Sequence, residues 1–223
     1  GTESGGVQSV ERAFDVLEAL ARAEHELTVA EVAAATQLAA PTAHRLLRTL
    51  LIRGYVQQPD SRGYALGSGL IHLGKRATPE LATLAQGVLA DLEEASEETA
   101  NLAVLDGDLV AYIAQMPSRH RMRMFTEVGR RVLPHASGVG KAILSTLPET
   151  RVREIIARTG LPKYTPSTLT TDSALLADLR ESRRRGFAVD DGEQEVGVRC
   201  IAVPIPGSSP PAAVSISGPV ARV

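Results

Sequence analysis

The stretch Thr28–Arg48, TVAEVAAATQLAAPTAHRLLR, decides the fold of this chain. Thr28 and Glu31 have the spacing of a capping box, in which each side chain accepts a hydrogen bond from the backbone N–H of the other residue. Pro41 suits the first position of a second helix, because its φ already fits a helix and no N–H is missed there. The stretch therefore predicts two short helices that meet at a turn.

The second predicted helix separates apolar from basic side chains. At about 100° per residue, one arc roughly 100° wide holds Leu46, Leu50, Ala43 and Leu47. The opposite arc holds His44, Arg48, Pro41 and Arg45. Such a helix is held by its leucines and presents arginines, which can bond guanine edges or phosphates in a major groove. An ordinary amphipathic helix with a solvated charged face has the same pattern, so this helix alone does not distinguish a DNA-binding helix from an ordinary surface helix. The residues that follow are needed to decide.

The next stretch, Leu50–Leu66, alternates apolar and polar residues around the turn sequence PDSRG. This pattern predicts a two-stranded hairpin with a Gly-containing turn. A helix pair followed by such a hairpin is a winged helix-turn-helix, which binds DNA. Arg62 at the hairpin tip is expected to reach a phosphate or a minor groove, whereas Arg53 at the helix-to-strand corner fits a phosphate contact and a surface charge equally well.

An earlier helix completes this predicted domain. Ser9 or its neighbour can cap a helix that runs to about Ala23. Its expected buried stripe is Val10, Phe14, Leu17 and Leu20. We therefore expect a winged helix-turn-helix domain at residues 8–67, after a disordered leader at residues 1–7 and before a linker at residues 68–78.

The charge of the chain argues against a generally basic nucleic-acid binder, because its formal net charge is −2. Basic residues are nevertheless concentrated between Pro41 and Tyr64, a stretch that contains four arginines and a single acid, Asp60. DNA binding should then depend on a few well-placed contacts, and on a second copy of the domain if a palindrome is read.

Residues 79–223 predict a second, α+β domain. Thr78 can cap a helix that begins with Pro79 and continues through Glu98. Its apolar positions are Leu81, Leu84, Val88, Leu92 and Ala95. Further helices are expected at about 139–145, 149–159 and 172–185. Strands are expected at 101–115, as a hairpin around Asp106 and Gly107, and at 121–128, 198–205 and 212–218. We expect a largely antiparallel sheet with helices on one side.

Cysteine content and hydropathy bound the cellular setting. Cys200 is the only cysteine, which excludes an intramolecular disulfide and fits a reducing cytosol. No apolar run is long enough to span a bilayer. We therefore expect a cytoplasmic protein that does not bind membranes.

Eight ordered blocks of the sequence resemble IclR-type transcriptional regulators. They are SVERAFDVLEALA, LTVAEVAAATQL, PTAHRLLRTLLIRGYV, YALGSGLIHLG, EVGRRVLPHASGVGKAIL, TPSTLT, RRRGFAVDDGEQEVGVRCIAVPI and AVSISGP. The resemblance implies a winged helix-turn-helix joined by a linker helix to a GAF-like domain for effector binding and oligomerisation. It also implies a repressor of a catabolic operon that binds palindromic promoter DNA as a homodimer or dimer of dimers, without cofactor or enzymatic activity.

The chain departs from the family pattern in three places. Ala40 and Pro41 stand where relatives commonly carry a basic residue and Ser, so base contacts cannot be carried over, and the order of Leu133 and Pro134 varies among members. Relatives usually continue past the position of Val223 into another helix. The residues expected to contact DNA are Thr28, Pro41, Thr42, His44, Arg45, Arg48 and Arg62.

The resemblance also implies an effector pocket, since members closest in their pocket motifs bind glyoxylate or related oxo-acids. An aromatic acid and allantoin are the alternatives. The implied pocket residues are Met124 on a strand, Gly138 and Val139 at a helix start, Asp190, Val198, Cys200, Ser215 and Ser217. Free N–H groups at a helix start suit a carboxylate, and residues two apart on a strand face the same side.

Other interpretations of these residues remain open. Cys200 fits a small buried apolar residue, Ser215 and Ser217 fit a solvated edge strand, and Asp190 fits a turn. An enzyme with Cys200 as nucleophile, His135 as base and Asp190 as its orienting group is disfavoured, because apolar surroundings raise the pKa of a thiol. A metal site is also disfavoured, because short ligand spacings are lacking among His135, Asp190, Asp191, Glu193 and Cys200.

Overall fold

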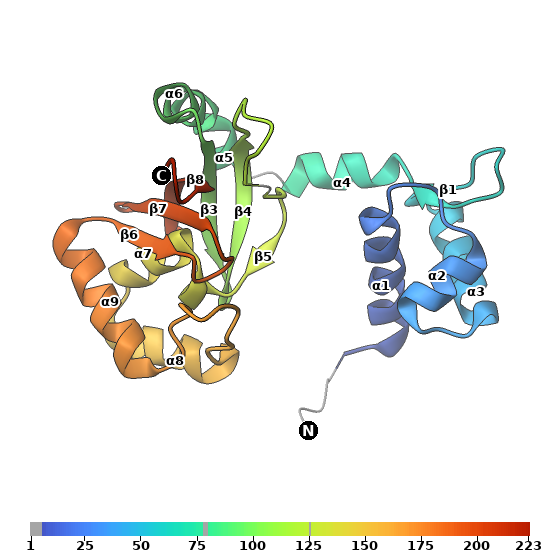
Figure 1. Ribbon diagram of the computed structural model, residues 1–223. Helices are drawn as coiled ribbons and strands as arrows, with labels where there is room; N and C mark the ends of the chain where they lie inside the picture. Colours follow the sequence, from blue (N-terminus) through green and yellow to red (C-terminus); the bar gives the residue numbers. More distant parts are fainter. Residues whose placement is uncertain (1–5, 78–79, 125) are drawn as a thin grey trace. The chain divides into compact units, whose positions relative to one another are not determined.

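The computed structural model describes residues 6–77, 80–124 and 126–223. The chain divides into two compact units, residues 1–78 and 79–223 (Figure 1). Most of the predicted leader, and the predicted helix start at Thr78 and Pro79, lie outside the described residues.

Unit 1 has the helices and hairpin that the sequence predicts. Its elements are α1 (Gln8–Arg22), α2 (Val29–Thr36), α3 (Ala40–Ile52), β1 (Val56–Gln57), β2 (Ala65–Leu66) and α4 (Gly69–Ala77). The capping box at α2 is confirmed, with both of its hydrogen bonds present. β1 and β2 are antiparallel, and the backbone of Leu27 bridges Tyr64 beside them. One apolar cluster joins α1, α2, α3 and the hairpin, centred on Val16, Val32 and Leu47.

Two predictions about α3 and the hairpin need correction. Pro41 is the second residue of α3, after Ala40, and Ala39 is the N-cap residue. Residues 50–52 belong to α3 rather than to a strand, so the strands of the hairpin are only two residues long. The helix ends where Gly54 takes a φ of 75°, a value that glycine adopts readily.

The predicted buried stripe of α1 is wrong in its first half. Val10 and Phe14 are exposed, Phe14 at 60% of its surface, whereas Val16, Ala19 and Leu20 are buried. Ser9 lies inside the helix, and Val7 occupies the N-cap position. The helix carries apolar residues on more than one face, and periodicity alone does not tell which face the rest of the unit covers.

Unit 2 is built on one antiparallel sheet with the strand order β5-β4-β3-β8-β7-β6. Its elements in chain order are α5 (Glu80–Leu84), α6 (Gln86–Ser96), β3 (Thr99–Asp106), β4 (Leu109–Met116), β5 (Arg131–Val132), α7 (Gly138–Thr146), α8 (Glu149–Thr159), α9 (Asp172–Arg185), β6 (Ala188–Asp191), β7 (Val198–Ile205) and β8 (Ala212–Pro219). The predicted hairpin at 101–115, the terminal strand pair and the three later helices are confirmed.

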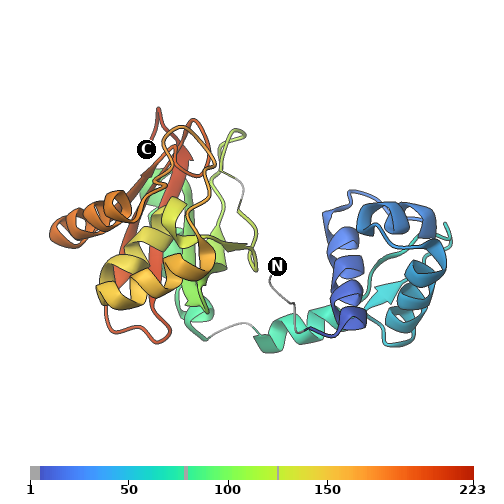
Figure 2. The ribbon, with the colours of Figure 1, turned by 90° about the horizontal axis from the view of Figure 1, so that it is seen from below.

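Helices cover both faces of this sheet, so the expectation of helices on one side is wrong (Figures 1 and 2). α5 and α6 pack on Leu102 and Val104, whereas α7 packs on the opposite face, on Ala103 and Ala202. α8 and α9 pack behind α7 in a separate cluster. Consistent with this, every residue of β3 from Thr99 to Val104 is buried, as in a strand covered on both faces.

Two further expectations for unit 2 are corrected. The described residues of 121–128 form no strand, and Met124 lies in an irregular segment; Phe125 lies outside the described residues. The helix predicted through Glu98 is interrupted at Ala85, and Leu84 is 71% exposed while Ala82 and Leu89 are buried. Within the described ranges, no helix combines the length and apolar character needed to cross a membrane.

Candidate functional site

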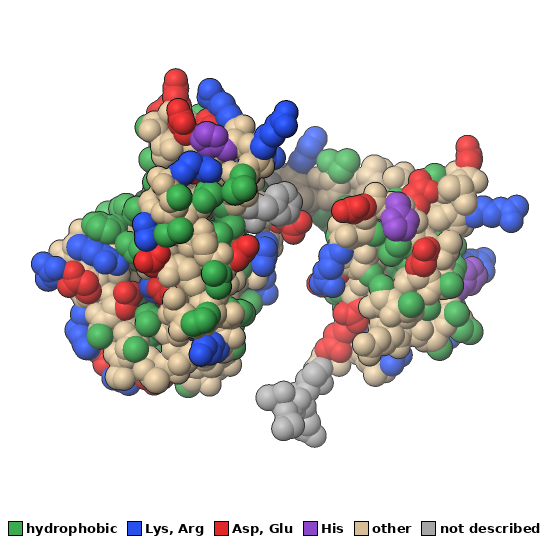
Figure 3. Space-filling model, in the orientation of Figure 1, with side chains coloured by type: hydrophobic (Ala, Val, Ile, Leu, Met, Phe, Trp, Pro, Cys, Tyr) green, Lys and Arg blue, Asp and Glu red, His purple; other side chains and the backbone are tan. Residues whose placement is uncertain are grey.

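The exposed face of α3 carries the basic side chains that the sequence places there. His44, Arg45 and Arg48 are exposed, whereas Ala43, Leu47 and Leu50 are buried on the opposite side. No ion pair within the described residues involves Arg45 or Arg48. Their guanidinium groups are therefore available to an anionic partner, and Figure 3 shows basic side chains on the surface of unit 1.

The remaining predicted DNA-contacting residues differ in how free they are. Arg62 is exposed at the tip of the hairpin, where its N–H donates to the carbonyl of Pro59 at 3.1 Å. Thr28 is exposed, but its hydroxyl donates to Glu31 Oε2 at 2.8 Å, so this side chain serves the start of α2. Pro41 is exposed and Thr42 half-buried. Arg53 lies over the ring of Tyr55, 5.8 Å from its centroid.

In unit 2 the sheet register brings four of the predicted effector residues together. Asp190 pairs with Cys200, and Cys200 pairs with Ser217 on the next strand, with Ser215 two residues away. All four are buried, so the solvated edge-strand interpretation of the serines is wrong. The start of α7 closes over them, because a Cβ atom built on Gly138 would lie 2.6 Å from Cys200 Sγ. Glycine therefore permits the close approach of helix to strand.

Cys200 is chemically quiet in this position. Burial raises the pKa of its thiol, against the smaller opposing effects of Ser217 and of the backbone of Val139. Burial also lowers the pKa of His135, whose Nε2 lies 3.0 Å from the carbonyl oxygen of Pro162. The raised pKa of the thiol and the contact of the imidazole with Pro162 argue against a nucleophile and base pair, because the thiol stays protonated and the imidazole is occupied elsewhere.

Asp190 shapes the chain that follows it. Its Oδ1 accepts hydrogen bonds from the backbone N–H groups of Glu193 and Gln194, at 2.8 and 3.4 Å. Burial raises the pKa of Asp190 to about 6, although these hydrogen bonds oppose the shift. Asp190 is the penultimate residue of β6, and its carboxylate stabilises the turn that follows the strand. The interpretation of Asp190 as a turn residue is therefore right in part.

A cavity of about 290 Å³ opens beside this buried group. It is lined by Tyr112, Met124, Thr126, Arg130, Val132, Tyr164, Gln194 and Glu195. Met124 is the one predicted effector residue in this lining. Tyr112 connects the two regions, because it lines the cavity and because burial, together with the nearby carboxylate of Asp190, raises the pKa of its phenol. Val198 instead borders a different hollow, with Val196 and Val220.

The lining of the cavity includes a cation, Arg130, and an acid, Glu195. Arg130 supplies a guanidinium, which suits a carboxylate. Met124, Val132 and the two tyrosines supply apolar surface. Tyr112 lies opposite Ala103 in the hairpin, so the hairpin pattern of the sequence could have placed both side chains on the same face of the sheet. The sequence does not show that Tyr164 and Gln194, from distant loops, meet Tyr112 at the cavity.

A buried charged group that sequence reasoning missed lies behind the cavity. Lys141 on α7 is fully buried, and its Nζ donates to Glu193 Oε1 at 2.5 Å and lies 3.2 Å from Asp178 Oδ2. Glu193 directly precedes Gln194 and Glu195 of the cavity wall. In the part of the chain that is described, no three His, Cys, Asp or Glu side chains are arranged to hold a metal ion.

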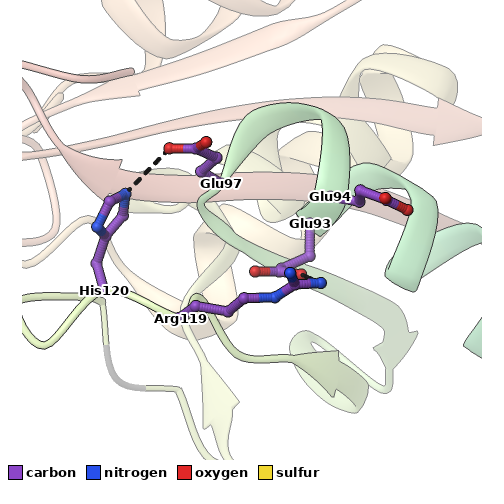
Figure 4. A pocket seen from close by; sticks show the side chains of 5 residues that line it. All are labelled: Glu93, Glu94, Glu97, Arg119 and His120. Atoms are coloured by element: carbon purple, nitrogen blue, oxygen red, sulfur yellow. Dashed lines mark ion pairs between the residues drawn. The ribbon is translucent and has the colours of Figure 1, made fainter.

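A second hollow, of about 270 Å³, lies at the C-terminal end of α6 (Figure 4). Its lining is charged: Glu93, Glu94, Glu97, Arg119 and His120. Arg119 pairs with Glu93 at 3.3 Å, and His120 Nε2 lies 3.5 Å from Glu97 Oε2. None of the predicted site residues lines it, so the cavity beside Tyr112 is the better candidate for an effector.

Known proteins resemble the chain over both units. Residues 9–60 match the model of the IclR helix-turn-helix domain, and residues 77–223 match that of the bacterial transcriptional regulator IclR C-terminal domain. The transcriptional repressor IclR of Escherichia coli is 38% identical over 227 residues, which cover 99% of this chain and 83% of that protein.

Solved structures agree with this match. The Thermotoga maritima IclR structure superposes with a TM-score of 0.80 at 28% identity, covering 97% of this chain and 89% of that one. An IclR homologue from Microbacterium hydrocarbonoxydans, complexed with 4-hydroxybenzoate, superposes with a TM-score of 0.80 at 25% identity, covering 96% and 90%. The protein therefore belongs to the IclR family of transcriptional regulators, and is not an enzyme.

Proposed function

We propose that the chain is a cytoplasmic repressor of a catabolic operon that reads a palindromic promoter sequence as a homodimer or a dimer of dimers. A small organic acid such as glyoxylate, bound in unit 2, changes its affinity for DNA. The observation that carries the DNA-binding part is the exposure of Arg45 and Arg48, unpaired by any described acid, opposite the buried leucines of α3. A helix of this kind presents its cations to a duplex without disturbing its own packing.

The exposed apolar residues of α1 support self-association. Val7, Val10 and Phe14 are exposed on one side of this helix, away from the core of unit 1. A second copy that covers them would remove this surface from water. It would also present two copies of α3, as a palindromic operator requires.

Selection of DNA from a pool of random duplexes tests the DNA-binding part. The full-length protein should enrich an inverted repeat whose half-sites are about one helical turn, or a multiple of it, apart. Sequences enriched equally by the Arg45→Ala/Arg48→Ala variant, or the absence of any repeat, would contradict the proposal.

The volume and lining of the cavity support a small acid as effector. At about 290 Å³ it is near the lower end of the range of ligand pockets. Glyoxylate is one candidate, and allantoin is an alternative. The apolar and aromatic side chains of the lining favour an aromatic acid as the second candidate, and a related structure holds 4-hydroxybenzoate.

A thermal-shift experiment discriminates among these ligands, because a ligand that binds only the folded protein raises its melting temperature. Glyoxylate, allantoin and 4-hydroxybenzoate are compared on the wild type and on Arg130→Met. We expect one acid to raise the melting temperature of the wild type and to do so less in the variant. Equal shifts in both proteins would show that the acid binds elsewhere.

A further inference from the structure

The charged group around Lys141 has no role in the proposed DNA contact. It lies next to residues that line the cavity. Lys141 is completely buried, in a helix whose other buried residues are uncharged and, apart from Ser145, apolar or glycine. Burying a cation is costly unless it is paired, and even a paired one contributes little net stability compared with well-packed apolar residues. Such a group can instead serve to fix one conformation.

The acid that Lys141 holds belongs to the wall of the cavity. We call residues 192–195, between β6 and β7, the wall segment. Lys141 Nζ donates to Glu193 Oε1 at 2.5 Å, and the next two residues, Gln194 and Glu195, line the cavity. Asp190 accepts the N–H groups of Glu193 and Gln194, so side chain and backbone of Glu193 are both held.

A neighbouring loop is fastened to the same segment. Thr165 Oγ1 donates to the carbonyl of Gly192 at 2.6 Å, and Thr168 Oγ1 donates to the carbonyl of Glu193, also at 2.6 Å. Tyr164, which precedes Thr165, lines the cavity as well. Tyr164 and Gln194, which the sequence did not bring together, are therefore both positioned by contacts of the wall segment.

We propose that Lys141 is a positioning residue of the effector cavity, which holds the wall segment through Glu193 so that Gln194, Glu195 and Tyr164 face the bound molecule. This inference rests on the proposed function in taking the cavity as the effector site. Within the described residues, Glu193 Oε2 and Gln194 Oε1 are buried without a hydrogen-bond partner. Gln194, which lines the cavity, thus has an unsatisfied acceptor, and a ligand with an O–H or N–H group would satisfy it.

Hydrogen–deuterium exchange of the full-length protein tests the proposal without a known ligand. Lys141→Met alone leaves buried acids without their cation, so the main variant is Lys141→Met/Glu193→Gln, which also removes the acidic charge of the pair. The matched control is Arg158→Met/Asp108→Asn, which removes the ion pair between α8 and the turn after β3. We expect exchange at Glu193 and Gln194 to become at least tenfold faster in the main variant and to stay unchanged in the control. Unchanged exchange in both would overturn the proposal.

Binding of a probe acid provides a readout that a purely structural role would not move. The probes are glyoxylate and 4-hydroxybenzoate, followed by calorimetry between pH 5 and pH 8. The charged groups around Lys141 are Glu193, Asp178, Asp190 and His135. Its charge lowers the pKa of Asp190, so its removal should move the pH midpoint of probe binding upward, with at least tenfold weaker binding at neutral pH. Lys141→Arg should restore most of the affinity.

The outcomes separate this inference from the proposed function. Faster exchange in the wall segment with wild-type affinity and an unmoved pH profile would overturn the positioning role. A wild-type protein that binds neither acid contradicts the assignment of these effectors instead, and the exchange result then decides the role of Lys141. DNA binding without effector should be the same in all variants.

Discussion

The two units use their cations in opposite ways. In unit 1, Arg45 and Arg48 remain in water on the exposed face of α3. In unit 2, Lys141 is withdrawn from water and held between Glu193 and Asp178. An exposed cation that binds a partner loses its hydration only when the partner binds, whereas a buried cation affects the folded structure at all times. The first should therefore govern affinity for DNA, and the second the stability and shape of its own unit.

The largest expected effect concerns the buried cation. Lys141→Met leaves the buried Glu193 and the half-buried Asp178 without their counter-charge, which should lower the free energy of unfolding of unit 2 by about 3–5 kcal/mol. Urea denaturation of the full-length protein measures this loss. Adding Glu193→Gln should recover part of it, and a single variant as stable as the wild type would contradict the comparison.

The next effect concerns pH. Burial raises the pKa of Asp190 from 3.8 to about 6, so the folded protein retains a proton there that the unfolded chain has already released. This group therefore lowers the free energy of unfolding as the pH rises from about 4 to about 6, by up to about 3 kcal/mol. The stability of Asp190→Asn relative to the wild type should rise by that amount across this window.

Urea denaturation at a series of pH values checks the effect. Asn keeps an oxygen that can accept from the N–H groups of Glu193 and Gln194, and any change in the strength of these hydrogen bonds adds only an offset that does not depend on pH. A difference between the two proteins that is constant from pH 4 to pH 7 would show that the carboxyl group titrates normally.

A smaller effect is expected for the exposed cations. Arg48→Ala should weaken binding to the selected operator by about 1–3 kcal/mol if Arg48 reads a base, or reduce the salt dependence by about one counterion if it contacts a phosphate. Fluorescence anisotropy at several salt concentrations distinguishes the two. Arg22→Ala is the control, because Arg22 is equally exposed on α1 and pairs with Glu18. The unfolding free energy should change little in either variant.

The smallest expected effect concerns the capping box. Thr28→Ala should lower the free energy of unfolding of unit 1 by about 1 kcal/mol, because the N–H of Glu31 loses its acceptor. Thr28→Ser should restore it. If Thr28 also contacts DNA, the operator affinity of Thr28→Ala should fall by more than this loss of stability explains. An unchanged affinity would show that Thr28 serves only to cap α2.

Local patterns predicted the elements of this fold well, but not which faces meet. The capping box, the arginine face of α3 and the hairpin around Gly107 follow from spacing within a few residues, and all are confirmed. The faces of α1 and α5 were mispredicted, because Phe14 and Leu84 fit an apolar stripe and yet point away from their cores. Burial depends on what packs against a helix, and spacing does not contain that information.

The candidate effector site shows the same division. The family resemblance named Asp190, Cys200 and Ser217 for one pocket, and the pairing of neighbouring strands brings them together. The cavity itself needed loops whose positions depend on distant contacts. Lys141 and Glu193 are 52 residues apart, and a lysine within GVGKAIL looks like a solvated charge until the fold buries it.

The contact between Gly138 and Cys200 has a consequence for the chemistry of ageing protein. A Cβ at Gly138 would stand 2.6 Å from the sulfur, so the start of α7 leaves no space around this thiol on that side. An oxygen atom added to the sulfur by peroxide would have to occupy space between α7 and β7 that is already filled. The same tight contact that excludes reagents from the thiol would thus turn any oxidation that did occur into a displacement of α7.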